Sequence, residues 1–222
     1  ARAVAPGPYL LGGGFSAVAG WLLWRRTTRV ARPSRRISGY AALGGGLVAA
    51  LSLYVERLVL GWTGLEFDVR AAGATSALMA MFLLAAPLEE AAKVLVIWPL
   101  YRTRRIDRSR LGLCYAALSG TGFAAVEGVW AFFASGTTGL TLVRSLLGTL
   151  AHVFFAGAWG YALGARRSGG KFFSATWIGA VVLHGLFDHI LWGRGPGYLA
   201  ATLPLLAFML LGAWIVLRKA AP

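Results

Sequence analysis

Apolar residues dominate this chain in long stretches that polar turns interrupt at intervals of about 25 to 35 residues. An α-helix needs about 20 apolar residues to cross a bilayer, so each stretch predicts a membrane-spanning helix. Seven such stretches are found, at residues 9–24, 38–60, 71–101, 111–134, 140–165, 172–192 and 198–217. The first is short, and Pro87 interrupts the third. The pattern therefore predicts an all-α transmembrane bundle of about seven spans.

The charges in the turns assign a direction to these spans. Cations gather in every second turn: six arginines lie between residues 25 and 36, five between 102 and 110, and three cations between 166 and 171. Two more follow the last stretch, and the intervening turns have almost none. Since cytosolic loops are enriched in Lys and Arg, we expect the N-terminus outside and the C-terminus in the cytosol.

Composition agrees with a membrane protein. Hydrophobic residues make up 58% of the 222 residues and charged residues 14%, whereas soluble domains have about a quarter charged. We expect one transmembrane domain over residues 1–222. The net charge of +14 does not indicate nucleic-acid binding, because membrane sidedness explains the basic turns, which are also suited to anionic lipid head groups. Cys114 is the single cysteine, so we expect a small core residue and no disulfide.

Several ionisable residues fall inside the predicted spans, where they are costly and usually functional. They are Glu89, Glu90 and Lys93 in the third span, Glu127 in the fourth, His152 in the fifth, and His184, Asp188 and His189 in the sixth. At about 1.5 Å per residue from the cytosolic ends, the depths of Glu89, Glu127, His152, His184 and Asp188 fall between roughly 18 and 24 Å. Four spans thus place polar groups in one layer, which predicts a single polar chamber slightly beyond the bilayer midplane.

Helical spacing indicates which of these side chains meet. His184 and Asp188 are four residues apart and share a face, so the carboxylate can orient the imidazole. Lys93 follows Glu90 by three residues and Glu89 by four, and either pair is also explained as a buried ion pair between packed helices. A carboxylate beside an oriented histidine can deprotonate water for attack on an amide carbonyl. The spacing permits this chemistry but does not require it.

Four motifs follow one another on successive spans: EExxK at 89–93, FxxxE at 123–127, His152, and HxxxD at 184–188. In this order they resemble the PrsW family of intramembrane proteases. They are more distantly similar to the CAAX prenyl endopeptidases and the bacteriocin-processing enzymes. The resemblance covers the motif-bearing core at about residues 71–192.

The resemblance implies a role for each matched residue. Glu89 and Glu90 match an essential glutamate pair, with Glu89 as the base that activates water. Glu127 stands where the prenyl endopeptidases have a water-activating histidine. His184 and Asp188 match the pair that holds the oxyanion in those enzymes.

The remaining matched residues are an additional family histidine and two supporting side chains. These are His152, Lys93 and Phe123. The implied substrate is a single-span, anti-sigma-factor-like protein of a bacterial inner membrane, cut near its outer juxtamembrane region.

Alternatives remain open at this point. We expect water activation by glutamate and histidine without a metal, but Glu127, His152 and His184, with or without Glu89, also suit zinc. No HExxH motif argues for that metal. A proton-coupled transporter or channel would also bury such groups, although no inverted repeat with paired broken helices is evident. A non-catalytic scaffold that binds partner helices is the third interpretation.

Overall fold

The computed structural model describes residues 7–135, 139–191, 200–208 and 211, and in these ranges the chain is helical with no strand. The elements are α1 (Gly7–Val30), α2 (Arg35–Thr63), α3 (Val69–Met79), the π-helix η1 (Ala80–Ala85), α4 (Ala86–Arg102), α5 (Ser109–Ser135), α6 (Gly139–Ala165), the 3₁₀ turn η2 (Arg166–Ser168) and α7 (Phe173–Leu191). Residues 200–208 are also helical. The predicted fold class is confirmed as an all-helical bundle.

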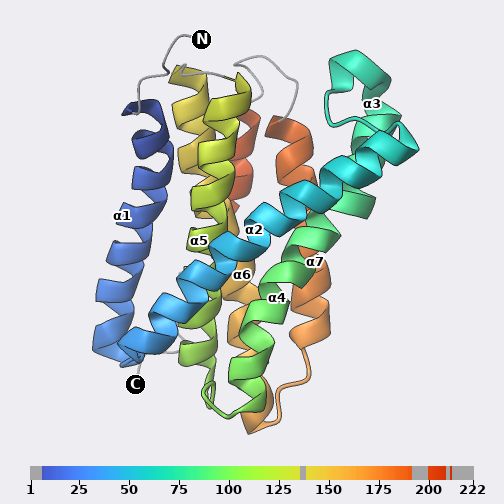
Figure 1. The fold of residues 1–222 in the computed structure, drawn as a ribbon. Coiled ribbons are helices and arrows are strands. Elements are labelled where there is room, and N and C mark those ends of the chain that lie inside the picture. Colours follow the sequence, from blue (N-terminus) through green and yellow to red (C-terminus); the bar gives the residue numbers. More distant parts are fainter. Residues whose placement is uncertain (1–6, 136–138, 192–199, 209–210, 212–222) are drawn as a thin grey trace.

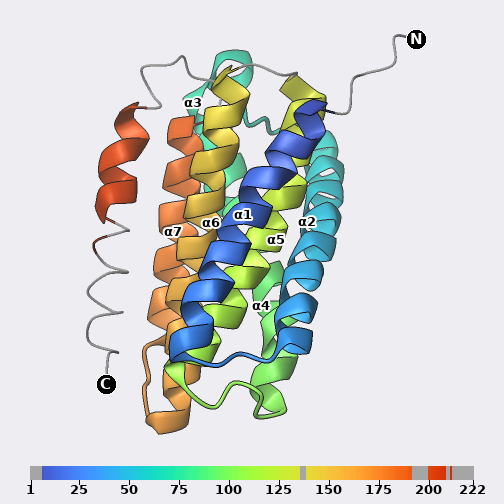
Figure 2. The ribbon, with the colours of Figure 1, turned by 90° about the vertical axis from the view of Figure 1, so that its left-hand side faces the viewer.

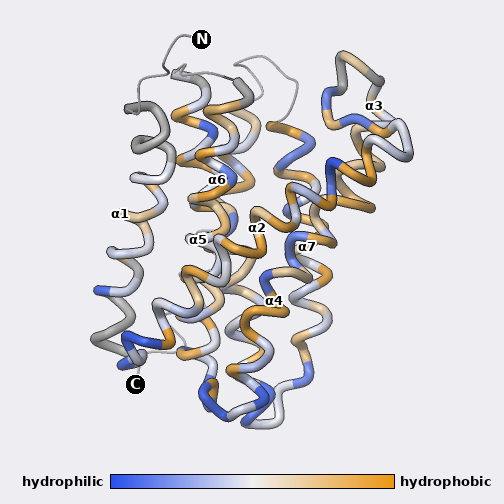
Figure 3. The backbone as a smooth tube through the Cα atoms, in the orientation of Figure 1, coloured by the Kyte–Doolittle hydropathy of each residue, from blue (hydrophilic) through white to orange (hydrophobic). Residues whose placement is uncertain are grey.

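The turns after α1, α4 and α6 lie at one end of the bundle (Figure 1). These are the basic turns, and they give the lower end its hydrophilic colour (Figure 3). Among the described residues, four helices are long and apolar enough to cross a membrane by themselves, and they include all or nearly all of α2, α5, α6 and α7. The protein is therefore a membrane protein with several apolar helices. The count of seven spans and the outward N-terminus stay predictions.

The third predicted span, 71–101, is segmented. Gly73, with φ 82°, kinks α3, a π-helix covers residues 80–85, and α4 starts at Ala86 with Pro87 in its first turn. Proline has no N–H to donate and favours the start of a helix, which accounts for an α-helix that begins anew there. Prediction from the sequence located the interruption at Pro87 but not the π-helix. Half of the seventh predicted span, 198–217, falls outside the described residues.

Helices α5 and α6 form the centre of the bundle, with α1, α2 and α7 packed around them. Figure 2 shows α1 lying alongside this pair. The two central helices touch through small residues: a Cβ on Gly160 would collide with Ala116 and with the carbonyl oxygen of Gly112. Small residues thus let the backbones of α5 and α6 approach closely, as is common between membrane helices.

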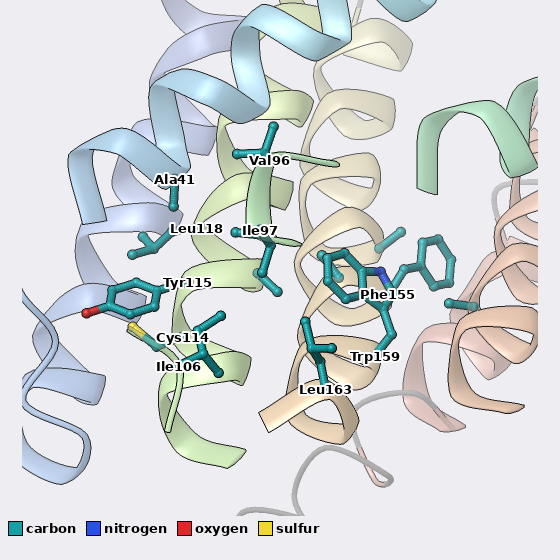
Figure 4. Close-up of a cluster of buried hydrophobic side chains, with 14 of the residues drawn as sticks. Ala41, Val96, Ile97, Ile106, Cys114, Tyr115, Leu118, Phe155, Trp159 and Leu163 are labelled. Atoms are coloured by element: carbon teal, nitrogen blue, oxygen red, sulfur yellow. The ribbon is translucent and has the colours of Figure 1, made fainter. Parts of the chain in front are cut away.

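A cluster of buried apolar side chains connects α2, α4, α5 and α6 (Figure 4). Cys114 and Tyr115 lie in it, so the prediction of a buried cysteine is confirmed. Phe155 and Trp159 extend the cluster along α6 to the polar residues of α4 and α7. The apolar cluster thus forms a wall against which the polar side chains are held.

Candidate active site

The structure brings together all of the residues that the motifs singled out. They come from α4 (Glu89, Glu90, Lys93), α5 (Phe123, Glu127), α6 (His152) and α7 (His184, Asp188). Helical spacing predicted that residues on one helix would meet, and depth predicted the common layer. The structure adds the contacts between residues of different helices, which the sequence did not predict.

Glu90 is the centre of this cluster and is completely buried. Its Oε1 accepts hydrogen bonds from Lys93 Nζ at 2.7 Å and from His184 Nδ1 at 3.0 Å. Its Oε2 accepts from the indole Nε1 of Trp159 at 2.8 Å. With both oxygens engaged, this carboxylate binds three side chains from three helices and is fully compensated.

Lys93 continues the network to His152. Its Nζ donates to His152 Nδ1 at 2.8 Å and lies 4.2 Å from the centre of the Phe123 ring. Because an ammonium has no lone pair, Nδ1 of His152 must be the acceptor, and Nε2 then carries the proton. That Nε2–H donates to Glu127 Oε2 at 2.5 Å. The tautomer of His152 follows from its two partners, and both of its nitrogens are engaged.

His184 is held by Glu90 on one side and faces two other carboxylates on the other. Its Nε2 lies 3.3 Å from Asp188 Oδ2 and 3.5 Å from Glu89 Oε2. Phe155 stacks on the imidazole, with 4.9 Å between ring centres. The ring is therefore fixed in position, and since Nδ1–H donates to Glu90, the neutral ring presents an acceptor nitrogen toward Glu89.

Glu89 differs from Glu90 because one of its carboxylate oxygens accepts no hydrogen bond from the described residues. Its side chain is buried, yet Oε2 has no hydrogen-bond partner among the described residues. Lys93 Nζ is 3.9 Å from that oxygen, which is too far for a hydrogen bond. A buried carboxylate oxygen left unpaired is costly and rare, so it indicates a function or a bound group.

A cavity of about 300 Å³ lies beside Glu89, toward the ends of α2, α5 and α7 that are opposite to the basic turns. Its ionisable lining residues are Glu56, Arg57, Glu89, Glu127, Arg144, His152 and Asp188. Glu90 and Lys93 are not among the lining residues and lie behind this wall. The site therefore has two layers. The outer layer lines the cavity, and the inner layer, Glu90 and Lys93, holds the side chains of the outer layer in position.

Sequence reasoning missed three of these lining residues, Glu56, Arg57 and Arg144. Glu56 of α2 is 4% exposed, its carboxyl group contacts that of Glu89, and its Oε1 has no hydrogen-bond partner among the described residues. The signal was present in the sequence, because Glu56 and Arg57 are a charged pair inside the apolar stretch 38–60. They lie outside every motif that was recognised.

The residues of this site are also of the kind that holds a metal ion. Glu89, His152 and His184 each offer one ligand atom, and these atoms lie within 4.8 Å of one another. The unpaired Oε2 of Glu89 and the outward Nε2 of His184 suit zinc. Glu127, a ligand candidate from the sequence, is instead bonded to His152. Both ring nitrogens of His152 are hydrogen-bonded, so His152 can bind a metal only if its hydrogen bond to Lys93 or to Glu127 breaks.

The comparisons with known proteins agree with the motifs. A family model described as "PrsW family intramembrane metalloprotease" matches residues 33–216, which is most of the chain and includes every residue of the cluster. No curated protein and no solved structure matches.

Proposed function

Because this chain belongs to the PrsW family of intramembrane proteases, we propose that it hydrolyses a peptide bond of a single-span, anti-sigma-factor-like membrane protein in the cavity beside Glu89. The observation that carries the proposal is the buried, unpaired Oε2 of Glu89 on the cavity wall. A carboxylate in that state is suited to accept a proton from water.

In the proposed reaction, Glu89 takes a proton from a water molecule whose oxygen attacks the carbonyl carbon of the scissile amide. The C–N bond then breaks, and Glu89 returns the proton to the departing amine. Glu90 does not react. It holds Lys93 and His184, which face Glu89 from two sides. Fixed positions of this kind lower the barrier by limiting reorganisation during the reaction.

His184 and Asp188 are the proposed oxyanion pair, as the resemblance implies. Nδ1–H of His184 is used by Glu90, so His184 can donate to an oxyanion from Nε2 only as an imidazolium. Asp188 lines the cavity 3.3 Å from that nitrogen and stabilises the imidazolium. The indole of Trp159 and the ring of Phe155 shield the inner layer on the α6 side.

The position of the cavity supports a cut near one membrane surface. It lies toward the end opposite to the basic turns, which is the outer end if cations mark the cytosol. We therefore propose that the scissile bond lies near the outer juxtamembrane region of the substrate, and that the enzyme acts in a bacterial inner membrane.

The decisive experiment compares wild-type protein with Glu89→Gln in liposomes, using a panel of single-span anti-sigma-factor-like substrates and intact mass as the readout. We expect cleavage by wild type and a loss of about 100-fold or more in the variant, the usual contribution of a general base. Cleavage by a folded Glu89→Gln protein at the wild-type rate would overturn the assignment of Glu89 as the base.

For the chemistry of activation we propose the metal-free form, because the ammonium of Lys93 already engages Nδ1 of His152. If zinc is bound, Glu89, His152 and His184 would hold it, and it would supply Lewis-acid activation of water. We expect the purified, active protease to contain less than one zinc per chain by elemental analysis, and to keep its cleavage rate after exhaustive chelation. Loss of cleavage on chelation and recovery on adding zinc would establish the metal-dependent form.

A further inference from the structure

Helices α2 and α5 touch closely over part of their length and separate toward the ends opposite to the basic turns. Gly45 packs on the carbonyl oxygen of Ser119, and Gly122, in the middle of α5, packs on that of Ala42, so closely that neither glycine has room for a Cβ. From this contact α2 runs obliquely across the bundle (Figure 1). Two straight helices that cross at a close contact diverge beyond it, and a groove of about 480 Å³ opens between them.

The α2 wall of this groove is formed by Ala50, Leu53, Tyr54 and Arg57. They are spaced at i, i+3, i+4 and i+7, so they form one continuous stripe along the helix. Tyr54 is 62% exposed, although the groove runs beside it. The stripe is apolar except at its end, where Arg57 lies.

The α5 wall repeats the same spacing with Val126, Val129, Trp130 and Phe133. Phe133 is 61% exposed. Two apolar stripes with helical periodicity, facing each other across a groove, provide the surface on which another apolar helix packs by its side chains.

The groove continues into the catalytic cavity. Leu53, Arg57 and Trp130 line both spaces. At the boundary the guanidinium of Arg57 lies over the Trp130 ring, with Cζ 3.9 Å from the ring centre. This stacked pair is the boundary that a chain would pass on its way from the groove to Glu89.

We propose that the α2–α5 groove is the lateral docking site for the transmembrane segment of the substrate, and that the Arg57–Trp130 pair is its passage to the cavity. This inference rests on the proposed function. A lipid acyl chain also fits an apolar groove, but a protease needs its occupant to reach Glu89, and the shared lining residues provide that route. The positive charge of Arg57 favours a substrate with an acidic residue beside its apolar segment.

The test is photocrosslinking from a benzophenone amino acid in the Glu89→Gln protein, with the same substrate panel in liposomes. The probe is placed at Tyr54, in the groove, and in the control at Tyr40, which is also an exposed tyrosine of α2 but does not line the groove. We expect the probe at position 54 to form an adduct with the substrate, and the probe at position 40 to form none.

A blocking substitution gives the kinetic counterpart. Ala50→Trp fills the groove, whereas Leu47→Trp places the same side chain on α2 outside it, at a residue that is 73% exposed. We expect Ala50→Trp to raise KM and to reduce cleavage of the membrane-embedded substrate, while Leu47→Trp cleaves as wild type does.

The outcomes separate the two proposals. If wild type cleaves but position 54 gives no adduct and Ala50→Trp is fully active, the groove is occupied by lipid and the inference is wrong. If position 54 gives the adduct and wild type does not cleave, the docking site stands and the proposed hydrolysis is wrong. If neither adduct nor cleavage occurs across the panel, both are overturned.

Discussion

Two adjacent glutamates in α4 have different surroundings, and this difference organises the chemistry. Glu90 is surrounded by donors from Lys93, Trp159 and His184, so its charge is compensated and its position fixed. Glu89 lines the cavity, and its Oε2 has no hydrogen-bond partner in the described part of the chain. Neighbouring helical residues project about 100° apart, which lets Glu90 hold its neighbours while Glu89 faces the cavity.

Glu56 provides a residue-scale prediction, because its carboxyl group contacts that of Glu89 on the cavity wall. Glu56→Gln keeps the size of the side chain but replaces the carboxyl group beside Glu89 with an amide. We expect this change to displace the Glu89 carboxylate and to lower kcat by about tenfold or more. The cleavage rate in liposomes is the measurement. Glu66→Gln is the control, since Glu66 is exposed and outside the cavity, and it should cleave normally. Equal rates for both variants would remove Glu56 from the site.

At the scale of elements, the site depends on how α4 and α2 are placed. The π-helix η1 leads directly into α4, so the helix that bears Glu89 begins only three residues before it. Such π segments are frequent at functional sites, where the extra residue changes the direction of the following side chains. The contacts at Gly45 and Gly122 keep α2 against α5, and the oblique course of α2 beyond them brings Glu56 to the cavity.

The α2–α5 contact predicts the effect of a single methyl group. Gly45→Ala would place a Cβ against the carbonyl of Ser119, a rigid backbone atom, so we expect a destabilisation of about 1–3 kcal/mol from overpacking. Thermal unfolding in detergent measures it. Gly39→Ala is the matched control on the same helix, with no atom within 4 Å of the added carbon. It should be neutral or slightly stabilising, and an equal loss in both variants would contradict the close-contact explanation.

At the scale of the whole molecule, charge and cavity occupy opposite ends. The basic turns gather at one end, whereas the cavity is lined by residues near the far ends of α2, α5 and α7. If cations mark the cytosol, the cavity lies toward the other side of the membrane, and the proposed cleavage would release the soluble outer part of the substrate first.

This arrangement predicts the labelling of single cysteines in a Cys114→Ser background. Thr63→Cys lies at the end of α2 opposite to the basic turns, and Ser168→Cys lies in one of those turns, both at exposed residues. We expect a membrane-impermeant thiol reagent added to intact cells to label position 63, and to label position 168 only in inverted vesicles. The reverse pattern would invert the orientation and place the cavity toward the cytosol.

The helical class, most helix bounds and the chemical character of the site could be predicted from the sequence. Hydrophobic periodicity and loop charge are local properties, and a bilayer requires backbone hydrogen bonds to be satisfied within each helix. The depths of Glu89, Glu127, His152 and His184 follow from the rise per residue, so their common layer was predictable as well. The motif order was sufficient to indicate the family.

Only the tertiary structure decided which partners these residues have. Rotation of each helix about its axis and the crossing of α2 over the bundle determine that Trp159 donates to Glu90, that Lys93 joins it to His152, and that Glu56 reaches Glu89. The hydrogen bonds that Glu90 and Lys93 make to other helices join residues 59 to 94 positions apart in the sequence. Local periodicity carries no information on how one helix face meets another, because that depends on the packing of side chains from several helices at once.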